Sequence, residues 1–340
     1  MNGLSLQDLA DKLNNKVSRQ ALHKYEKGEV VPDSEMMALL CNALNVRTDF
    51  FFRKTKVELA EIEFRKLKKL PAKDENKIIE EVRDLLSRYL ELEEILAIES
   101  GFVNPLQEIK TIESFEDIEN AAARLREAWC LGNDPIANCT DLLEDHHIKV
   151  VEVDAGDSYD GMQTWANNNS IPVIAINKAK VKSADRVRFT LLHELAHLLL
   201  LPLKDMSESK REKYCHQFAA AMLLPKTAAE NELGKYRHKI MIQELGALKN
   251  QYGISIQAII MRAKDMGIVS ESYCKQFFFY MKQMNWKIIE PFEYTGIEGS
   301  GRFEQLLFRA LAEELISVSK AAALSNLSVA EFRDKIANIS

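Results

Sequence analysis

Two histidines and a glutamate at helical spacing are the residues of this chain best suited to chemistry. His193, Glu194 and His197 form an HExxH motif inside an otherwise apolar run that ends at Leu201. On a helix, residues four apart share a face, so both imidazoles can bind one metal ion while Glu194 reaches a water molecule there. Burying three polar groups is costly unless they find partners. The motif therefore indicates a zinc-dependent hydrolase; the plainer alternative is two helix histidines satisfied by hydrogen bonds.

A second helix is expected to supply another ligand, because a catalytic zinc takes three protein ligands and keeps one position open. Residues 209–225 read as a helix that stops at Pro225, and it offers Glu212, Cys215 and His216. Glu212 and His216 are four apart, so either could face the metal while the other lies beside it. Spacing alone does not choose between them.

These two helices together resemble the signature of the ImmA/IrrE family of metallopeptidases. The resemblance is carried by residues 186–200 and by the alanine-rich stretch from Glu212 to Pro225. It implies a gluzincin-like zinc site, or one for another divalent metal such as Mn²⁺, in which Glu212 is the third ligand. His216 stands where the family usually has asparagine, so it is expected beside the metal or as an alternative ligand.

A small sheet is expected ahead of the HExxH helix, as in the same family. Residues 148–153 and 171–177 read as β-branched strands, with Asp160 and Gly161 in a turn between them. The second strand is expected to end at the mouth of the site with Asn177, and the helix to begin with a cap near Asp185. Arg188 is expected to be a surface or ion-paired residue rather than to contact substrate.

The ligand set predicts a mechanism. Glu194 would take a proton from a metal-bound water and pass it to the leaving amine of a cleaved peptide. A further side chain should stabilise the developing oxyanion. The sequence leaves four candidates for that role: Tyr159, Tyr214, His216 and His238.

The first fifty residues carry the pattern of a helix-turn-helix. Short helices are expected after Ser5 and after Ser18, with Gly28 closing the second and a third beginning near Pro32. This pattern resembles the XRE-type (Cro/cI-like) repressor domain. Because only two residues precede Gly3, the first helix of such a domain is expected to be missing.

The same resemblance implies that the second helix of the motif enters the major groove of DNA. Residues 16–27 hold four Lys or Arg and one Glu, in a chain of net charge −6, so any DNA affinity would come from a local patch. The alternative is a protein-binding or vestigial helical module. The residues expected to face DNA are Lys16, Ser18, Arg19, Gln20 and Lys24.

Composition predicts a globular protein of the cytoplasm. Hydrophobic residues make up 46% of the chain and charged residues 28%, which is not the balance of a disordered chain. No apolar run reaches the length of about 18 residues that a membrane span needs, and the N-terminus lacks a signal-peptide pattern. The five cysteines are scattered without a CxxC pair, which is typical of reduced thiols. No membrane partner is expected.

The fold is expected to be α+β and mostly helical, with a zincin-like metallopeptidase domain between helical segments. The linker is basic over residues 53–70 and then amphipathic over residues 73–100, whose apolar face is expected to dock on the peptidase domain or to self-associate. The expected segments are a helix-turn-helix module at 1–53, a helical linker at 54–125, the metallopeptidase domain at 126–268 and a helical C-terminal region at 269–340.

Three functions stay open on the sequence. The resemblance implies a zinc-dependent endopeptidase that cleaves an XRE-type repressor protein and so derepresses stress or mobile-element genes. The helix-turn-helix module favours a DNA-binding transcriptional regulator in which the metal site is structural or sensory. A component of a toxin–antitoxin type of system is the third hypothesis.

Overall fold

The computed structural model describes most of the chain, and these residues form two compact units. Unit 1 contains residues 1–58, 67–99 and 301–340, and unit 2 contains residues 59–66 and 100–300. Most of the basic stretch expected at residues 53–70 lies outside the described residues. No helix in the described ranges is both long and apolar enough to cross a membrane. The described ranges are 4–52, 57–60, 72–99, 101–156, 159–287 and 289–338.

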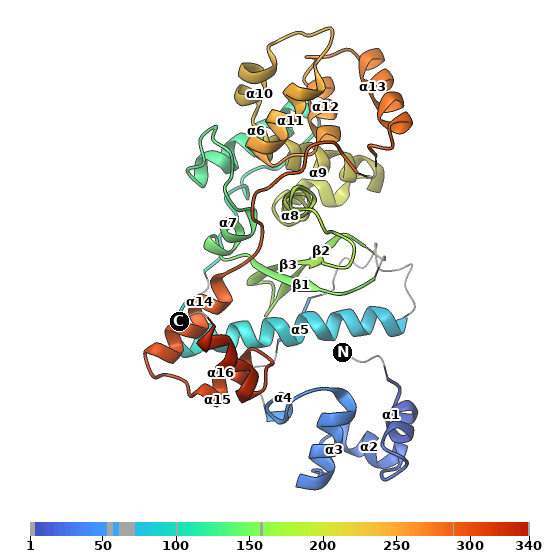
Figure 1. Ribbon diagram of the computed structural model, residues 1–340, viewed down its shortest axis with the longest axis vertical. Coiled ribbons are helices and arrows are strands. Elements are labelled where there is room, and N and C mark those ends of the chain that lie inside the picture. The colour runs from blue at the N-terminus through green and yellow to red at the C-terminus, as the bar shows by residue number, and fades with distance from the viewer. Residues whose placement is uncertain are drawn as a thin grey trace. The chain divides into compact units, whose positions relative to one another are not determined.

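Unit 2 contains a three-stranded sheet (Figure 1). Its order is β1-β3-β2, with β1 (Lys149–Val153) parallel and β2 (Gly161–Ala166) antiparallel to β3 (Ile171–Asn177). All seven residues of β3 are buried, as expected for the central strand. Strand β2 was not expected, because Asp160 and Gly161 were both predicted to lie in a turn; only Asp160 lies in a bend, and Gly161 begins the strand.

Helix α8 (Ala184–Leu199) packs on one face of this sheet, and α9 (Glu208–Leu223) packs on α8 (Figure 1). The small residues of α9 allow close approach, and both helices share one apolar core with the sheet. The remaining elements of unit 2 are α6 (Phe115–Ala128), α7 (Cys139–Asp145), the short 3₁₀ helix η2 (Leu201–Asp205), α10 (Lys226–Leu233), α11 (Ile242–Tyr252), α12 (Ile256–Asp265) and α13 (Glu271–Gln283).

After α13 the chain runs without regular structure along unit 2, and we call residues 289–300 the strap. Two of its glutamates are buried against helices that precede it by more than thirty residues. Glu290 bonds Lys249 and the first backbone amides of α12, and Glu298 forms an ion pair with Arg188 of α8. The strap is therefore anchored at both ends.

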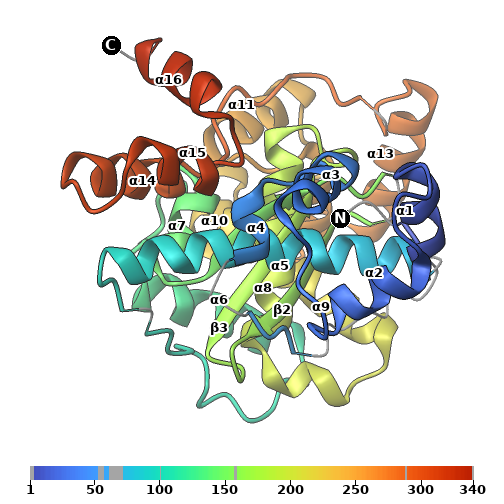
Figure 2. The same cartoon turned by 90° about the horizontal axis from the view of Figure 1, so that it is seen from below.

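Unit 1 begins with the helix-turn-helix, α1 (Leu6–Lys12), α2 (Arg19–Glu26) and α3 (Ser34–Leu44), followed by α4 (Thr48–Phe52) (Figure 2). The caps expected from the sequence are present, since the hydroxyls of Ser5 and Ser18 accept hydrogen bonds from the first turns of α1 and α2. A small apolar core holds the first three of these helices together. It contains Leu9, Leu13, Val17, Leu22 and Leu40.

Unit 1 also contains α5 (Ala72–Ile95) and three C-terminal helices, α14 (Arg302–Ala312), α15 (Val318–Leu324) and α16 (Val329–Ala337). The amphipathic helix expected at residues 73–100 is α5. Its C-terminal apolar residues pack on the C-terminal helices, which were not among the partners expected for it. Arg88 of α5 donates a hydrogen bond to the carbonyl of Leu324, 2.9 Å away. Self-association through residues 73–100 stays a prediction for the rest of that face.

Candidate metal centre

The HExxH motif lies in the buried part of α8. His193, Glu194 and His197 are 6%, 2% and 8% exposed, and every residue from Thr190 to Leu199 is buried. Leucine and alanine side chains fill the core around them, so the three polar groups cannot be satisfied by bulk water. Their partners must therefore come from the protein or from a bound ion.

Helix α9 brings a carboxylate to both histidines. The Nε2 atoms of His193 and His197 lie 3.2 Å apart, and the two carboxylate oxygens of Glu212 lie 3.2 Å and 3.3 Å from them. Donors bound at about 2.0–2.2 Å to a tetrahedral ion are roughly 3.3–3.5 Å from one another. The three side chains thus fit a single divalent ion, and the side chain of Glu212, 29% exposed, opens the cluster toward solvent.

Cys215 lies behind this cluster. Its sulfur is 3.5 Å from Nδ1 of His197, the ring nitrogen opposite the one that faces Glu212. If Nε2 binds an ion, Nδ1 carries the proton and donates to the sulfur, which fixes the tautomer and the plane of the ring. The sequence offered Cys215 as a ligand candidate, but the structure places it behind His197 rather than among the converging donors.

His216 lies beside the cluster and is exposed. Its Nδ1 is 2.6 Å from the carbonyl oxygen of Glu212, and its ring centroid is 4.5 Å from that of His193. Since a carbonyl oxygen accepts, Nδ1 of His216 is the donor. Among the described residues, the group of donors that could hold an ion consists of His193, His197 and Glu212, without His216.

Glu194 lies against β2 at a residue that has no side chain. A Cβ atom built on Gly161 would lie 3.2 Å from Cγ of Glu194 and 2.6 Å from Cγ2 of Thr190. The glycine therefore allows α8 to lie close to the strand at the glutamate of the motif.

Two of the four residues considered for stabilising the oxyanion contact other residues instead. The hydroxyl of Tyr214 donates to the carbonyl of Glu113, 2.8 Å away, and the ring of His238 packs against Tyr236. Tyr159 is buried. Of the four, His216 has its ring against a histidine of the cluster.

Asn177 of β3 and Arg188 of α8 make buried hydrogen bonds and an ion pair that stabilise the fold. Asn177 is fully buried, and its amide donates to the carbonyls of Gly156 and Tyr159, so backbone hydrogen bonds occupy its side chain; its place at the mouth of the site stays a prediction. Arg188 is fully buried in an ion pair with Glu298, as the ion-paired alternative predicted.

The expected cap at the start of α8 is corrected. Ser183 has the N-cap conformation but makes no side-chain cap hydrogen bond, and Asp185 binds Lys249 at 2.9 Å instead. Burial lowers the pKa of Lys249, but its hydrogen bonds to Asp185 and Glu290 outweigh that effect and hold the pKa above its usual value of 10.5. Lys249 therefore stays charged and joins α8 to the strap.

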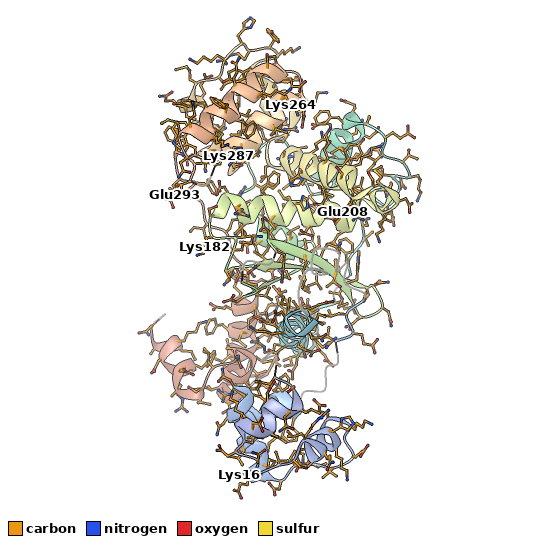
Figure 3. The ribbon with its side chains drawn as sticks, turned by 90° about the vertical axis from the view of Figure 1, so that its right-hand side faces the viewer. Lys16, Lys182, Glu208, Lys264, Lys287 and Glu293 are labelled. Carbon is orange, nitrogen blue, oxygen red and sulfur yellow. The ribbon has the colours of Figure 1, made fainter. Side chains whose placement is uncertain are left out.

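The side chains expected to face DNA all lie on the surface of the helix-turn-helix. Lys16 precedes α2 (Figure 3), Ser18 caps it, and Arg19, Gln20 and Lys24 are exposed along it. The hydroxyl of Ser18 accepts from the amide of Ala21, so capping already uses it. The other four side chains lie at the surface of the described structure, where a phosphate backbone could reach them.

Fold and site together define a metallopeptidase-type domain that follows a helix-turn-helix. Residues 143–264 match the family model described as the IrrE N-terminal-like domain, and residues 1–51 match the model described as helix-turn-helix. The chain therefore carries a metallopeptidase domain of the ImmA/IrrE family behind an XRE-type helix-turn-helix domain, which confirms both resemblances and the α+β fold class. No curated protein matches this chain.

Proposed function

We propose that the protein is a metal-dependent endopeptidase in which His193, His197 and Glu212 hold the ion. The observation that carries this proposal is the convergence of their donor atoms to 3.2–3.3 Å between two buried helices. Two imidazoles and one carboxylate are a donor set typical of catalytic zinc, and they also suit Mn²⁺. The match to a metallopeptidase family supports the same assignment.

A bound ion would supply Lewis acidity, which polarises a peptide carbonyl and acidifies a water molecule. Glu194 is not among the converging donors of the cluster, and it packs close to strand β2 at Gly161. We assign it the role of general base, which takes a proton from the attacking water and returns it to the leaving amine. We assign His216 to the oxyanion, because it lies at the surface beside His193.

We further propose an XRE-type repressor as the substrate, cleaved in the cytoplasm so that stress or mobile-element genes are derepressed. The support is the chain's own XRE-type domain, which places it in gene regulation. Purified protein loaded with Zn²⁺ or Mn²⁺ would be incubated with XRE-type repressors encoded beside its gene, with Glu194→Gln as control. New fragments with the parent protein alone support the proposal, and fragments of equal yield with Glu194→Gln overturn it.

A DNA-binding regulator with a structural or sensory metal site is the second candidate. The surface positions of Lys16, Arg19 and Lys24 favour it. A band-shift titration on operator-like DNA should show binding that weakens with salt and is lost in Arg19→Ala. Arg333→Ala, an exposed arginine on α16, is the matched control and should bind as the parent does. Absence of any shift at low salt removes this candidate. No feature of the described residues favours a toxin–antitoxin component.

A further inference from the structure

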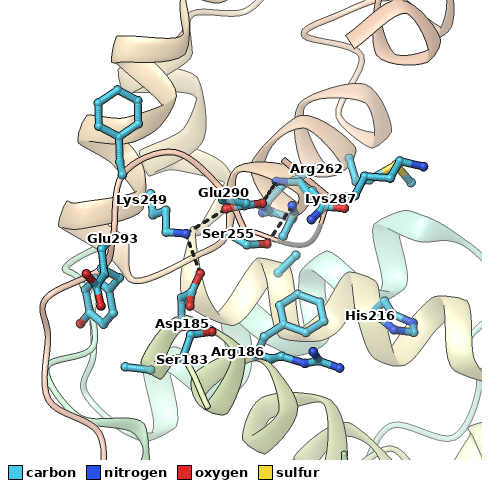
Figure 4. Close-up of a pocket in the computed structure, with 18 of the residues that line it drawn as sticks. Ser183, Asp185, Arg186, His216, Lys249, Ser255, Arg262, Lys287, Glu290 and Glu293 are labelled. Atoms are coloured by element: carbon cyan, nitrogen blue, oxygen red, sulfur yellow. Dashed lines mark hydrogen bonds and ion pairs between the residues drawn. The ribbon is translucent and has the colours of Figure 1, made fainter. Parts of the chain in front are cut away.

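A cavity of about 1320 Å³ lies beside the metal centre (Figure 4). Phe189 of α8 and His216 of α9 line one end of the cavity. The start of α8, helix α12 and the strap form most of the rest of its wall. His216 contacts both this cavity and the ring of His193, so the cavity adjoins the ligand cluster. Pockets for small molecules usually occupy about 300–1,000 Å³, so this one has room for a stretch of polypeptide.

The free charges of the cavity wall are mainly positive. Lys249 is neutralised by Asp185 and Glu290. No ion pair joins Lys182, Lys213 or Lys287 to any described residue, and all three are exposed. Against these three cations, Glu293 is the wall's one carboxylate without an ion pair among the described residues.

These charges are not evenly distributed. Lys182, Lys287 and Glu293 lie along one side of unit 2 (Figure 3). In the close-up, Lys287 lies on the same side of the cavity as His216, and Glu293 lies on the opposite side (Figure 4). The end of the cavity next to the metal centre is therefore the more positive one. Because the whole chain has a net charge of −6, this preference is local and would not follow from the overall field.

The same walls offer apolar contacts that are fixed in place. Ile289 and Phe292 of the strap are 75% and 43% exposed. Phe292 has a φ of +64° and its ring lies over Gly246, where an added Cβ would approach it to 2.6 Å. Glu290, two residues before it, accepts hydrogen bonds from the amides of Ile256 and Gln257 at 2.8 Å and 3.0 Å. The apolar wall is thus held before any ligand arrives.

We propose that this cavity is the subsite that receives the substrate polypeptide on one side of the scissile bond, and that it selects a segment with acidic side chains beside an aromatic or aliphatic one. The acidic groups would meet Lys213 and Lys287 near the metal centre, and the apolar group would lie against Phe292. The proposal rests on the proposed function, because the polypeptide must continue from the cavity to the ligand cluster.

Binding can be measured without cleavage on the full chain carrying Glu194→Gln. Fluorescence polarisation would compare three labelled peptides that differ in one pair of residues: Glu-Glu-Phe, Gln-Gln-Phe and Lys-Lys-Phe. We expect the Glu peptide to bind about tenfold more tightly than the Gln peptide, with a difference that shrinks as salt is added. The Lys peptide should bind most weakly of the three.

Charge reversal tests the lysines themselves. Lys213→Glu and Lys287→Glu should each weaken binding of the Glu peptide about tenfold. Lys239→Glu changes the net charge equally at an exposed lysine outside the cavity, and it should leave the Kd unchanged. Equal Kd values for the Glu and Gln peptides, or an equal loss in Lys239→Glu, overturn the proposal.

The two proposals fail in different ways. Lysine-dependent binding of the Glu peptide by a protein that cleaves no repressor would support the subsite and count against the endopeptidase. Cleavage of a repressor, with no preference between the Glu and Gln peptides, would overturn the subsite and leave the endopeptidase standing.

Discussion

Gly161 of β2 and Glu194 of α8 lie so close that no larger side chain fits between strand and helix. An added Cβ would meet Glu194 Cγ at 3.2 Å and Thr190 Cγ2 at 2.6 Å, and the backbone oxygen of Ala175 at 3.4 Å. Thr190 is one turn before Glu194, so the contact spans the part of α8 that precedes the histidines. The spacing between the sheet and the HExxH helix therefore depends on this glycine.

Gly161→Ala is expected to lower the free energy of unfolding by about 1–3 kcal/mol, because the extra methyl must displace Thr190 or the helix. Repressor cleavage should fall by more than the stability loss explains, since Glu194 moves with the helix. Urea denaturation measures the first effect. Gly101→Ala is the control, because nothing lies within 4 Å of its added Cβ. Equal stability of the two variants would show that the contact does not restrict the helix.

Replacing only one partner of the ion pair between Arg188 and Glu298 should strongly lower the free energy of unfolding. Their side chains are 0% and 1% exposed, so Arg188→Met leaves a buried carboxylate without its cationic partner, held by hydrogen bonds from Cys139 and Thr140. We expect a loss of about 3–5 kcal/mol in the free energy of unfolding. Arg309→Met, which removes an exposed pair with Glu313 on α14, should cost about 0–1 kcal/mol. Similar urea midpoints for both variants would contradict the anchoring role given to the strap.

The cysteines should differ in reactivity. Burial raises the pKa of the Cys139 thiol to about 12, whereas Cys130 is exposed. In the native protein at about pH 8.5, iodoacetamide should label Cys130 and leave Cys139 unmodified, because the thiolate is the reactive form. Peptide mass spectrometry before and after addition of denaturant measures both sites. Labelling of Cys139 at the rate of Cys130 in the native state would contradict its burial.

Acid should remove the contribution that the ionised Asp160 carboxylate makes to the stability of the fold. Burial raises the pKa of this carboxyl, but hydrogen bonds from Arg186 and Lys180 outweigh burial and hold the pKa below its usual value of 3.8. The folded pKa is the lower one, so the ionised carboxylate stabilises the fold above about pH 3.8 and the contribution is lost as pH falls through the folded value.

The measurement compares urea midpoints of the parent and Asp160→Asn between about pH 6 and pH 2.5. The parent should be the more stable at the upper end, and the difference should shrink toward the lower end. The effect should be small, since the Asp160 side chain is 37% exposed and screened by water. A difference that stays constant over this range would assign the effect of the substitution to packing rather than to ionisation.

The parts of the site that follow from local spacing were predictable. His193 and His197 are four residues apart on one helix, and Glu212 belongs to the next, so sequence order brings all three near one another. The contacts that were missed depend on long-range packing. Glu298 pairs with Arg188, which lies 110 residues earlier in the chain, and no local sequence pattern predicts such a pair.

Strand β2 was missed for a different reason. Glycine after aspartate is a frequent turn signal, but Gly161 is here the residue that permits close approach of a helix. The packing of the C-terminal helices on α5 was not foreseen either, because an amphipathic pattern gives the face of a helix and not the identity of its partner.

Metal content of purified variants tests the central assignment most directly. After loading with Zn²⁺ and exhaustive dialysis, elemental analysis should find about one ion per chain in the parent, in Glu194→Gln and in His216→Asn. Glu212→Ala should lose the ion, because His193 and His197 alone are an incomplete set. Circular dichroism would establish that this variant is folded. Full retention of the ion by folded Glu212→Ala, or its loss in His216→Asn, would contradict a centre built from His193, His197 and Glu212.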